Sequence, residues 1–157
     1  MLKSALFAAV GIVVSIAPAF AEDAKAIAER VIAKWGEIYN KGDAAAMTAL
    51  YTSDATLLPQ GSDQPIVGEA NIRKFFDDWL KQRLANASIP VTEAKMIDQK
   101  TLWSAGTWSG DIPGQNGSAS THVNGTWLNI MSQDGSEWRL RADTWNMMPP
   151  PATSAAK

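Results

Sequence analysis

The chain has 157 residues, of which 46% are hydrophobic and 19% are charged. This length and composition are typical of one soluble domain with enough chain to bury a core. The formal net charge of -2 leaves no excess of Lys and Arg to hold a phosphate backbone, so we expect no nucleic-acid partner. The chain has no cysteine and one histidine, which excludes disulfides, thiolate metal sites and His-rich metal sites, and we expect no metal.

Residues 1–21 have the pattern of a secretory signal peptide. Lys3 lies near the start, an apolar stretch covers residues 5–16, and the segment ends in Ala-Phe-Ala. The apolar stretch is short for a membrane span, so an uncleaved anchor helix is the weaker alternative. We therefore expect cleavage after Ala21, no stable membrane insertion afterwards, and a periplasmic or secreted location.

The next part of the chain is predicted to be helical. Apolar residues spaced by three and four form one broad stripe: Ala24, Ile27, Ala28, Val31, Ile32, Trp35, Ile38 and Tyr39. This helix is predicted to end at Gly42, and Asp43 is predicted to cap a short second helix over residues 44–50. After a brief strand at 55–58, a third helix is predicted from Gly68 to Leu84.

The second half of the chain is predicted to form strands near residues 89–99, 101–112, 119–132 and 136–148, separated by turn signals. Helices followed by long strands indicate an α+β fold, with helices packed on one face of a curved antiparallel sheet. We expect one domain over residues 22–148 and a disordered tail over 149–157, which starts with consecutive prolines.

Several segments are similar to a known family. In the first half they are residues 35–43 (WGEIYNKGD), 50–59 (LYTSDATLLP) and 67–76 (VGEANIRKFF). Near the end they are residues 125–128 (GTWL), 135–140 (GSEWRL) and 143–146 (DTWN). Together these segments resemble the opening and the final hairpin of the nuclear transport factor 2-like superfamily, in its SnoaL-like and ketosteroid-isomerase-like bacterial branch. The resemblance covers nearly all of the predicted domain.

The resemblance implies a cone, in which a strongly curved antiparallel sheet wraps three helices from the N-terminal half on its concave face. It also implies homodimers formed through the outer face of the sheet. The mouth of such a cone is an apolar cavity with a few polar groups, the usual form of a small-molecule site. We expect the ligand pocket to include Trp35, Tyr39, Tyr51, Leu58, Trp127 and Asn146.

The catalytic groups of ketosteroid isomerases do not transfer to this chain. In those enzymes an aspartate takes the proton, while a tyrosine and a protonated aspartic acid stabilise the oxyanion. The tyrosine falls near Trp35, the base near Leu58, and the acid near Thr126 or Trp127. Because none of these side chains matches, we do not expect that mechanism here.

Two other residues are catalytic candidates. His122 is one candidate because histidine is the side-chain type that ordinarily exchanges protons near neutral pH, although a lone histidine in a strand is more often a surface or structural residue. Asp143 is an acid among aromatic and apolar residues, where carboxyl groups are often perturbed. Strand alternation places Asp143 on the outer face, where it would pair with Arg139 or Arg141, unless a bulge shifts the register.

Tryptophans are frequent in the predicted strands, at positions 103, 108, 127, 138 and 145. Their parities differ, so some are expected on the outer face, where aromatic residues commonly build interfaces. In the last strand, alternation places Asn146 with Trp138 and Leu140 on one face and Trp145 on the other.

The leading hypothesis is an exported, homodimeric protein that binds a small apolar molecule in its pocket and uses no cofactor. The alternative is a cofactor-free isomerase, cyclase or hydrolase with Asp143 or His122 as general base. A third possibility is a homodimeric association module, like the association domain of calcium/calmodulin-dependent kinase. Whether the chain is an enzyme stays open at this point.

Overall fold

The computed structural model describes residues 23–114 and 118–148. The predicted signal peptide, with its cleavage after Ala21, and the predicted tail at 149–157 lie outside the described residues. Within the described part, no helix is both long enough and apolar enough to cross a membrane.

Helix α1 (Ala24–Lys41) carries the stripe that the sequence predicts. Asp23 caps its start, and its carboxylate accepts a hydrogen bond from the backbone N–H of Lys25. Its end lies at Gly42, whose φ of 69° is a left-handed conformation that favours glycine. All apolar positions of the predicted stripe are buried.

Two further helices follow. In α2 (Ala44–Thr48) the carboxylate of Asp43 accepts a hydrogen bond of 3.0 Å from Ala46, so the predicted cap is confirmed. Helix α3 (Glu69–Trp79) continues into the 3-10 turn η1 (Leu80–Gln82). The backbone N–H of Leu84 then donates to the hydroxyl of Tyr39 at 2.6 Å, which joins the end of this segment to α1.

Seven strands form one sheet: β1 (Tyr51–Leu58), β2 (Ile66–Val67), β3 (Ala85–Ser88), β4 (Val91–Asp98), β5 (Thr101–Ile112), β6 (Thr121–Asp134) and β7 (Glu137–Met147). Their order is β2-β1-β7-β6-β5, and β3 and β4 both pair with the far edge of β5. The pairing of β1 with β7 is parallel, and the other pairings are antiparallel.

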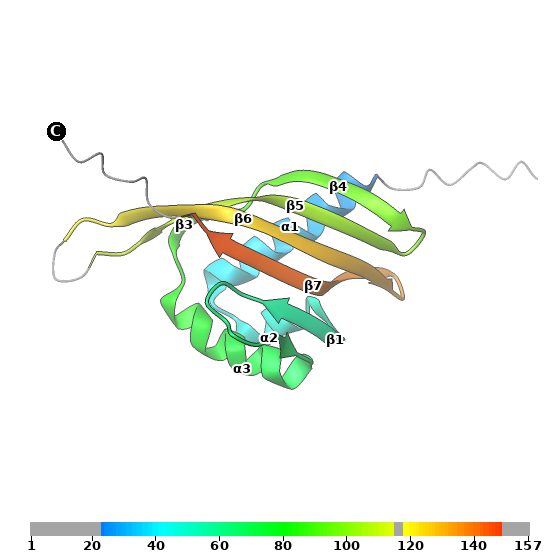
Figure 1. Cartoon of the computed structure of the whole chain (residues 1–157), viewed down its shortest axis with the longest axis horizontal. Coiled ribbons are helices and arrows are strands. Elements are labelled where there is room, and N and C mark those ends of the chain that lie inside the picture. Colours follow the sequence, from blue (N-terminus) through cyan, green and yellow to red (C-terminus); the bar gives the residue numbers. More distant parts are fainter. Residues whose placement is uncertain (1–22, 115–117, 149–157) are drawn as a thin grey trace, which may run out of the picture.

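The sheet is curved and the helices lie on its concave side. Figure 1 shows α1 crossing behind and beneath β5 and β6, with α2 and α3 at the lower edge near β1. The predicted α+β fold, with a curved sheet and three helices from the N-terminal half, is therefore confirmed.

The boundaries differ from the prediction in the first half of the sheet. Strand β1 begins at Tyr51 rather than Ala55, because its polar residues 52–54 hide the strand signal. The short strands β2 and β3 were not predicted, since β2 has two residues and the apolar positions of the four-residue β3 are alanines, which favour helix over strand.

Strand β7 contains a β-bulge that decides which side chains face the helices. Leu140 pairs with Met131 of β6, and Ala142 pairs with the adjacent Ile130, so Arg141 is the extra residue. Beyond this point the alternation is shifted by one. Asp143 therefore lies on the same inner face as Leu140, opposite Asn129.

Candidate functional site

A cavity of about 760 Å³ lies between the inner face of the sheet, α1 and the end of α3. Its wall includes six aromatic side chains, Trp35, Tyr39, Trp79, Trp108, Trp127 and Trp145. The wall also includes two cations, Lys81 in η1 and Arg83 just after it. Its volume is in the range of small-molecule sites.

The aromatic side chains contact one another across three elements. Trp35 stacks on Tyr39 with ring centroids 5.2 Å apart, because the two residues lie one turn apart on α1. Trp79 of α3 lies 5.3 Å from the ring of Tyr39 and 5.5 Å from that of Trp145 in β7. These contacts fix the rings in place, so this part of the wall is formed before any ligand binds.

Two indoles lie flat against the sheet with their N–H groups paired. Trp108 donates to the backbone oxygen of Asn146 at 2.8 Å, and Trp127 donates to that of Thr107 at 3.0 Å. Gly125 and Gly106 lie beneath these rings, where a Cβ atom would collide with the indole. The rings therefore present their apolar faces to the cavity.

Asp143 brings an acid to this apolar wall. Asp143 lines the cavity and is 9% exposed. The hydroxyl of Tyr51 donates a hydrogen bond of 2.8 Å to Oδ2 of Asp143. Trp35 in turn donates to the hydroxyl of Tyr51 at 3.1 Å, so α1 and β1 together hold the carboxyl group.

The surroundings of Asp143 set its protonation near neutral pH. Burial raises its pKa from 3.8 to about 7, although the hydrogen bonds from Tyr51 and from the backbone of Thr144 lower it. Burial also raises the pKa of Tyr51 well above its ordinary value, and the neighbouring charge of Asp143 adds to this. At neutral pH Asp143 can therefore either accept or donate a proton, while Tyr51 stays a hydrogen-bond donor.

A second buried polar pair lies beside Asp143. Asn129 is 1% exposed, lines the cavity and pairs directly with Asp143 across β6 and β7. Ser104 of β5 is fully buried and donates a hydrogen bond of 2.6 Å to Oδ1 of Asn129. Asp143, Asn129 and Ser104 thus form one cluster of buried polar side chains on the inner face of the sheet.

The residues predicted for the pocket are divided between the two sides of the sheet. Trp35, Tyr39 and Trp127 line the cavity, whereas Tyr51 is buried behind Asp143. Leu58 is 48% exposed and absent from the cavity wall, because the side chain of its neighbour Leu57 takes the buried position.

Asn146 also lies on the outer face, contrary to the alternation argument. The bulge in β7 moves the side chain of Asn146 from the inner to the outer face of the sheet. There its side-chain oxygen accepts a hydrogen bond from the backbone N–H of Thr126 at 3.0 Å. The same shift brings Trp145 to the inner face, where the sequence analysis did not place it.

His122 does not line the cavity. Its side chain is 63% exposed, and Nδ1 lies 2.8 Å from a carboxylate oxygen of Asp111. Among residues 23–114 and 118–148, no group of three or more His, Asp or Glu side chains is arranged to hold a metal ion.

Asn129 and Ser104 were missed from the sequence although a signal existed. Both alternate with apolar residues that face the helices, namely Leu102 on β5 and Trp127 and Met131 on β6. A polar residue on an otherwise apolar face is the kind of exception that marks a site.

The comparisons with known proteins agree with this fold. The family model of the SnoaL-like domain matches residues 32–143. Among curated proteins, no sequence matches this chain. Solved structures with the same fold come from several bacteria.

Three of these structures show how widely the fold is used. A ketosteroid isomerase-like protein from Erwinia carotovora atroseptica has a TM-score of 0.72 at 15% identity, covering 82% of this chain and 99% of that one. A protein from Xanthomonas campestris, provisionally assigned as a calcium/calmodulin-dependent protein kinase II association domain, has a TM-score of 0.68 at 18% identity, covering 82% and 89%. An NTF-2-like protein of unknown function from Shewanella oneidensis has a TM-score of 0.62 at 16% identity, covering 76% and 96%.

Identities this low show a shared fold and leave the activity to be argued from the site. The family model covers well over half of the chain and ends at Asp143 itself. The chain belongs to the SnoaL-like domain family, within the nuclear transport factor 2-like superfamily.

Proposed function

We propose that the chain is an enzyme that moves a proton on a small, largely apolar molecule held in the aromatic cavity, with Asp143 as the general acid and base. One observation carries this proposal. A carboxyl group with a pKa of about 7 lies in the wall of a preformed cavity, held there by Tyr51. A group with this pKa is suited to exchange protons at neutral pH.

The reaction class follows from what one such carboxyl group can do. Ionised Asp143 removes a proton from a carbon next to a carbonyl group, and the electron pair of the broken C–H bond forms the C=C bond of an enolate. The carbonyl oxygen takes up the negative charge. Protonated Asp143 then returns the proton to the same or a neighbouring carbon, which gives exchange or isomerisation.

Tyr51 and Trp35 support this role by position. The hydrogen bond of Tyr51 to Oδ2 fixes the carboxyl group, and the indole of Trp35 fixes the hydroxyl of Tyr51. Fixing a base before the substrate arrives lowers the entropy that must be lost in the reaction.

A protein that only bound a ligand would need the cavity but not this acid in its wall. Carboxyl groups with strongly raised pKa values inside cavities are concentrated at catalytic sites. This favours the enzyme over the passive binding protein, which was the leading interpretation of the sequence.

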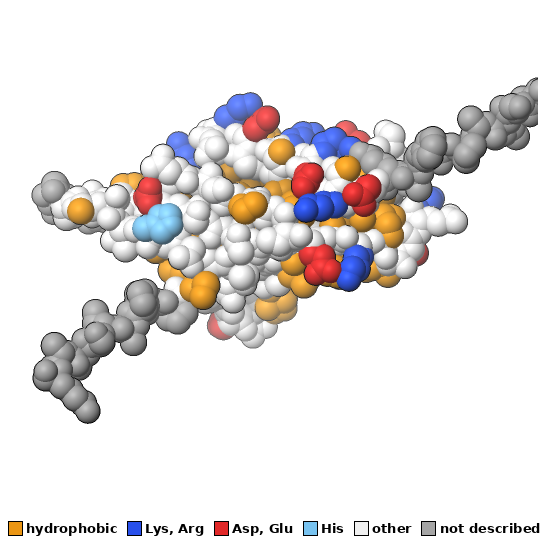
Figure 2. Space-filling view, turned by 90° about the horizontal axis from the view of Figure 1, so that it is seen from above, with side chains coloured by type: hydrophobic (Ala, Val, Ile, Leu, Met, Phe, Trp, Pro, Cys, Tyr) orange, Lys and Arg blue, Asp and Glu red, His pale blue; other side chains and the backbone are white. Residues whose placement is uncertain are grey.

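The outer face of the sheet supports a homodimer. Of the strand tryptophans, Trp103 is the one on this face, where its neighbours include Ile130 and the exposed Leu128. Figure 2 looks onto this face and shows an area left of its centre with few charged side chains, next to a group of Lys, Arg, Asp and Glu side chains on its right. We propose that two copies pair through it, and that the pattern of residues 1–21 directs the protein to the periplasm or outside the cell.

The test of the proposed activity is hydrogen exchange in a ketone probe. We suggest 2-tetralone in D₂O, with exchange of the protons next to its carbonyl followed by NMR. The wild type is expected to accelerate exchange, and Asp143→Asn is expected to lose roughly 100-fold or more of that rate. His122→Asn changes the other titratable candidate, which is exposed, and is expected to keep the wild-type rate.

Two results would overturn the proposal. Exchange that survives in Asp143→Asn would show that another group moves the proton. Binding of the ketone by the wild type without any acceleration of exchange would identify a passive binding protein.

A further inference from the structure

We propose that Asn129 is the residue that binds a carbonyl oxygen of the ligand, and that Ser104 positions Asn129 for this task. The inference rests on the proposed function, because it concerns the ligand on which Asp143 acts. It adds a chemical class to that ligand, namely a largely aromatic molecule with a carbonyl group near the reacting carbon.

The pair occupies a place where polar groups are unfavourable without a partner. Ser104 and Asn129 are essentially fully buried, and the side chains around them on the inner face include Leu102, Trp127 and Met131. A buried amide without hydrogen bonds destabilises the folded state. Polar residues are retained in such positions chiefly where they make specific hydrogen bonds.

The hydrogen bond from Ser104 occupies the acceptor atom of the Asn129 amide and leaves its donor group available. The hydroxyl of Ser104 donates to Oδ1, so the acceptor side of the amide is occupied. The donor side, Nδ2, carries two hydrogens and belongs to a residue that lines the cavity. In the described part of the chain, the hydrogen bond of the Asn129 side chain is the one from Ser104 to Oδ1, and the one fully buried side-chain nitrogen or oxygen without a partner is Nε of Arg139. Nδ2 of Asn129 is not among the fully buried unpaired atoms, so it keeps access to the cavity and can meet a ligand or solvent there.

This arrangement selects the chemistry of the ligand atom. An amide that can only donate favours an oxygen that only accepts, which describes a carbonyl group. Ionised Asp143 cannot take this role because it is itself an acceptor. The two residues are thus complementary, one for the oxygen and the other for the proton on carbon.

The distance between the side chains of Asn129 and Asp143 suits a carbonyl group and the C–H bond next to it. Asn129 and Asp143 are direct partners on neighbouring antiparallel strands and share the inner face. Side chains in such pairs have Cβ atoms about 4.5–5.5 Å apart. A carbonyl oxygen and the hydrogen on the adjacent carbon can therefore contact the two side chains at the same time.

The test uses a matched pair of probes, 2-acetonaphthone and 2-ethylnaphthalene, which differ by the carbonyl oxygen. Binding is measured by quenching of tryptophan fluorescence, since five tryptophans line the cavity in the described part of the chain. The wild type is expected to prefer the ketone by roughly fivefold to tenfold. The infrared carbonyl band of the bound ketone is expected to shift to lower frequency, which reports a hydrogen bond directly.

Asn129→Leu is expected to remove both the preference and the band shift while 2-ethylnaphthalene binds as before. Because this variant leaves the buried hydroxyl of Ser104 without a partner, the double variant Ser104→Ala with Asn129→Leu provides a second version that removes both polar groups. The matched control is Asn124→Leu on the same strand, which is exposed on the opposite face and is expected to behave as the wild type.

Ser104→Ala alone tests positioning. With Oδ1 released, the amide can turn over, so the band shift is expected to weaken and broaden. A Ser104→Thr variant, which keeps the hydroxyl, is expected to restore it.

The inference is wrong if the band shift persists in both Asn129 variants. It is also wrong if the band does not shift in the wild type although the ketone binds. These outcomes differ from failure of the proposed function, which is read from proton exchange in Asp143→Asn and does not depend on the carbonyl band.

Discussion

Tyr51 and Asp143 lie 92 residues apart in the sequence, and the hydroxyl of Tyr51 donates to Oδ2 of Asp143 at 2.8 Å. The parallel pairing of β1 with β7 brings them together, and the bulge at Arg141 turns Asp143 toward the tyrosine. Burial raises the pKa of Asp143 to about 7 and this contact opposes the rise, and several predictions depend on the balance between the two.

The first prediction concerns the pH dependence of activity. Proton removal requires ionised Asp143, so the exchange rate of a ketone probe should rise with pH, reach half its maximum near the pKa of about 7, and level off above it. The measurement is a pH–rate profile from pH 5 to 9. A profile that is flat over this range would contradict the role of Asp143.

The second prediction concerns Tyr51→Phe. The hydrogen bond from Tyr51 lowers the pKa of Asp143, so its removal should move the midpoint of the pH–rate profile to higher pH. Stability should also fall by about 1–3 kcal/mol, because the indole N–H of Trp35 loses its acceptor. A midpoint that stays in place or moves to lower pH would show that the contact does not stabilise the ionised form.

The third prediction concerns stability. The pKa of Asp143 is about 7 in the folded chain, above the ordinary value of 3.8. Its neutral form therefore favours folding, and this contribution is complete below about pH 4 and is lost as the pH rises through 7.

Asp143→Asn keeps the shape of the side chain without the charge. Its free energy of unfolding should therefore exceed that of the wild type at pH 8 by up to about 4 kcal/mol. The gain should shrink as the pH falls toward 4. Urea unfolding at the two pH values measures this, and an equal effect at both would contradict a raised pKa.

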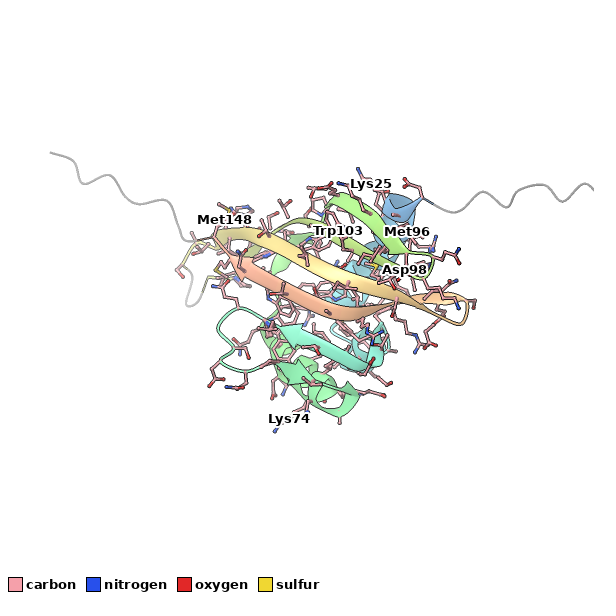
Figure 3. All side chains as sticks on the ribbon, turned by 45° about the vertical axis from the view of Figure 1, so that its right-hand side comes forward. Lys25, Lys74, Met96, Asp98, Trp103 and Met148 are labelled. Carbon is pink, nitrogen blue, oxygen red and sulfur yellow. The ribbon has the colours of Figure 1, made fainter. Side chains whose placement is uncertain are left out.

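The fourth prediction concerns the aromatic wall. Trp145→Ala removes an indole that lines the cavity and contacts Trp79, so the affinity for 2-acetonaphthone should fall by 10-fold or more. Trp103→Ala removes an indole from the outer face, and affinity should not change. Figure 3 labels Trp103 near Met96 and Asp98, residues of the neighbouring strand β4. Equal losses in both variants would mean that the ligand binds elsewhere.

The fifth prediction concerns the homodimer. Leu128→Glu places a charge on the outer face of β6, where the side chain is 47% exposed, and should convert dimers to monomers. Val67→Glu changes a similarly exposed apolar residue on β2 and should leave the dimer intact. Light scattering coupled to size-exclusion chromatography distinguishes these states. A wild type that is monomeric at high concentration would remove the basis of this proposal.

The helices and the long strands could be predicted because their signals are local. The apolar stripe of α1, the cap at Asp43 and the stop at Gly42 each depend on residues within a few positions of one another. The same is true of β5, whose predicted range of 101–112 is the range in the structure.

The candidate site could be predicted only in part because it depends on pairing between distant strands. Alternation along β7 gave the wrong face for Asn146 and Trp145. The bulge at Arg141 depends on how β7 pairs with β6, and the sequence of β7 alone does not reveal it. The partnership of Tyr51 with Asp143 depends on the parallel pairing of β1 and β7, which no short-range pattern encodes.

The central claim is that the carboxyl group of Asp143 titrates near neutral pH inside the cavity. It is tested most directly by carbon-13 NMR of protein labelled at its aspartate carboxyl groups, titrated from pH 3 to 9, with Asp143→Asn identifying the resonance. The structure predicts one aspartate resonance with a midpoint near pH 7, absent from the variant. A midpoint for Asp143 near the ordinary value of 3.8 would contradict it.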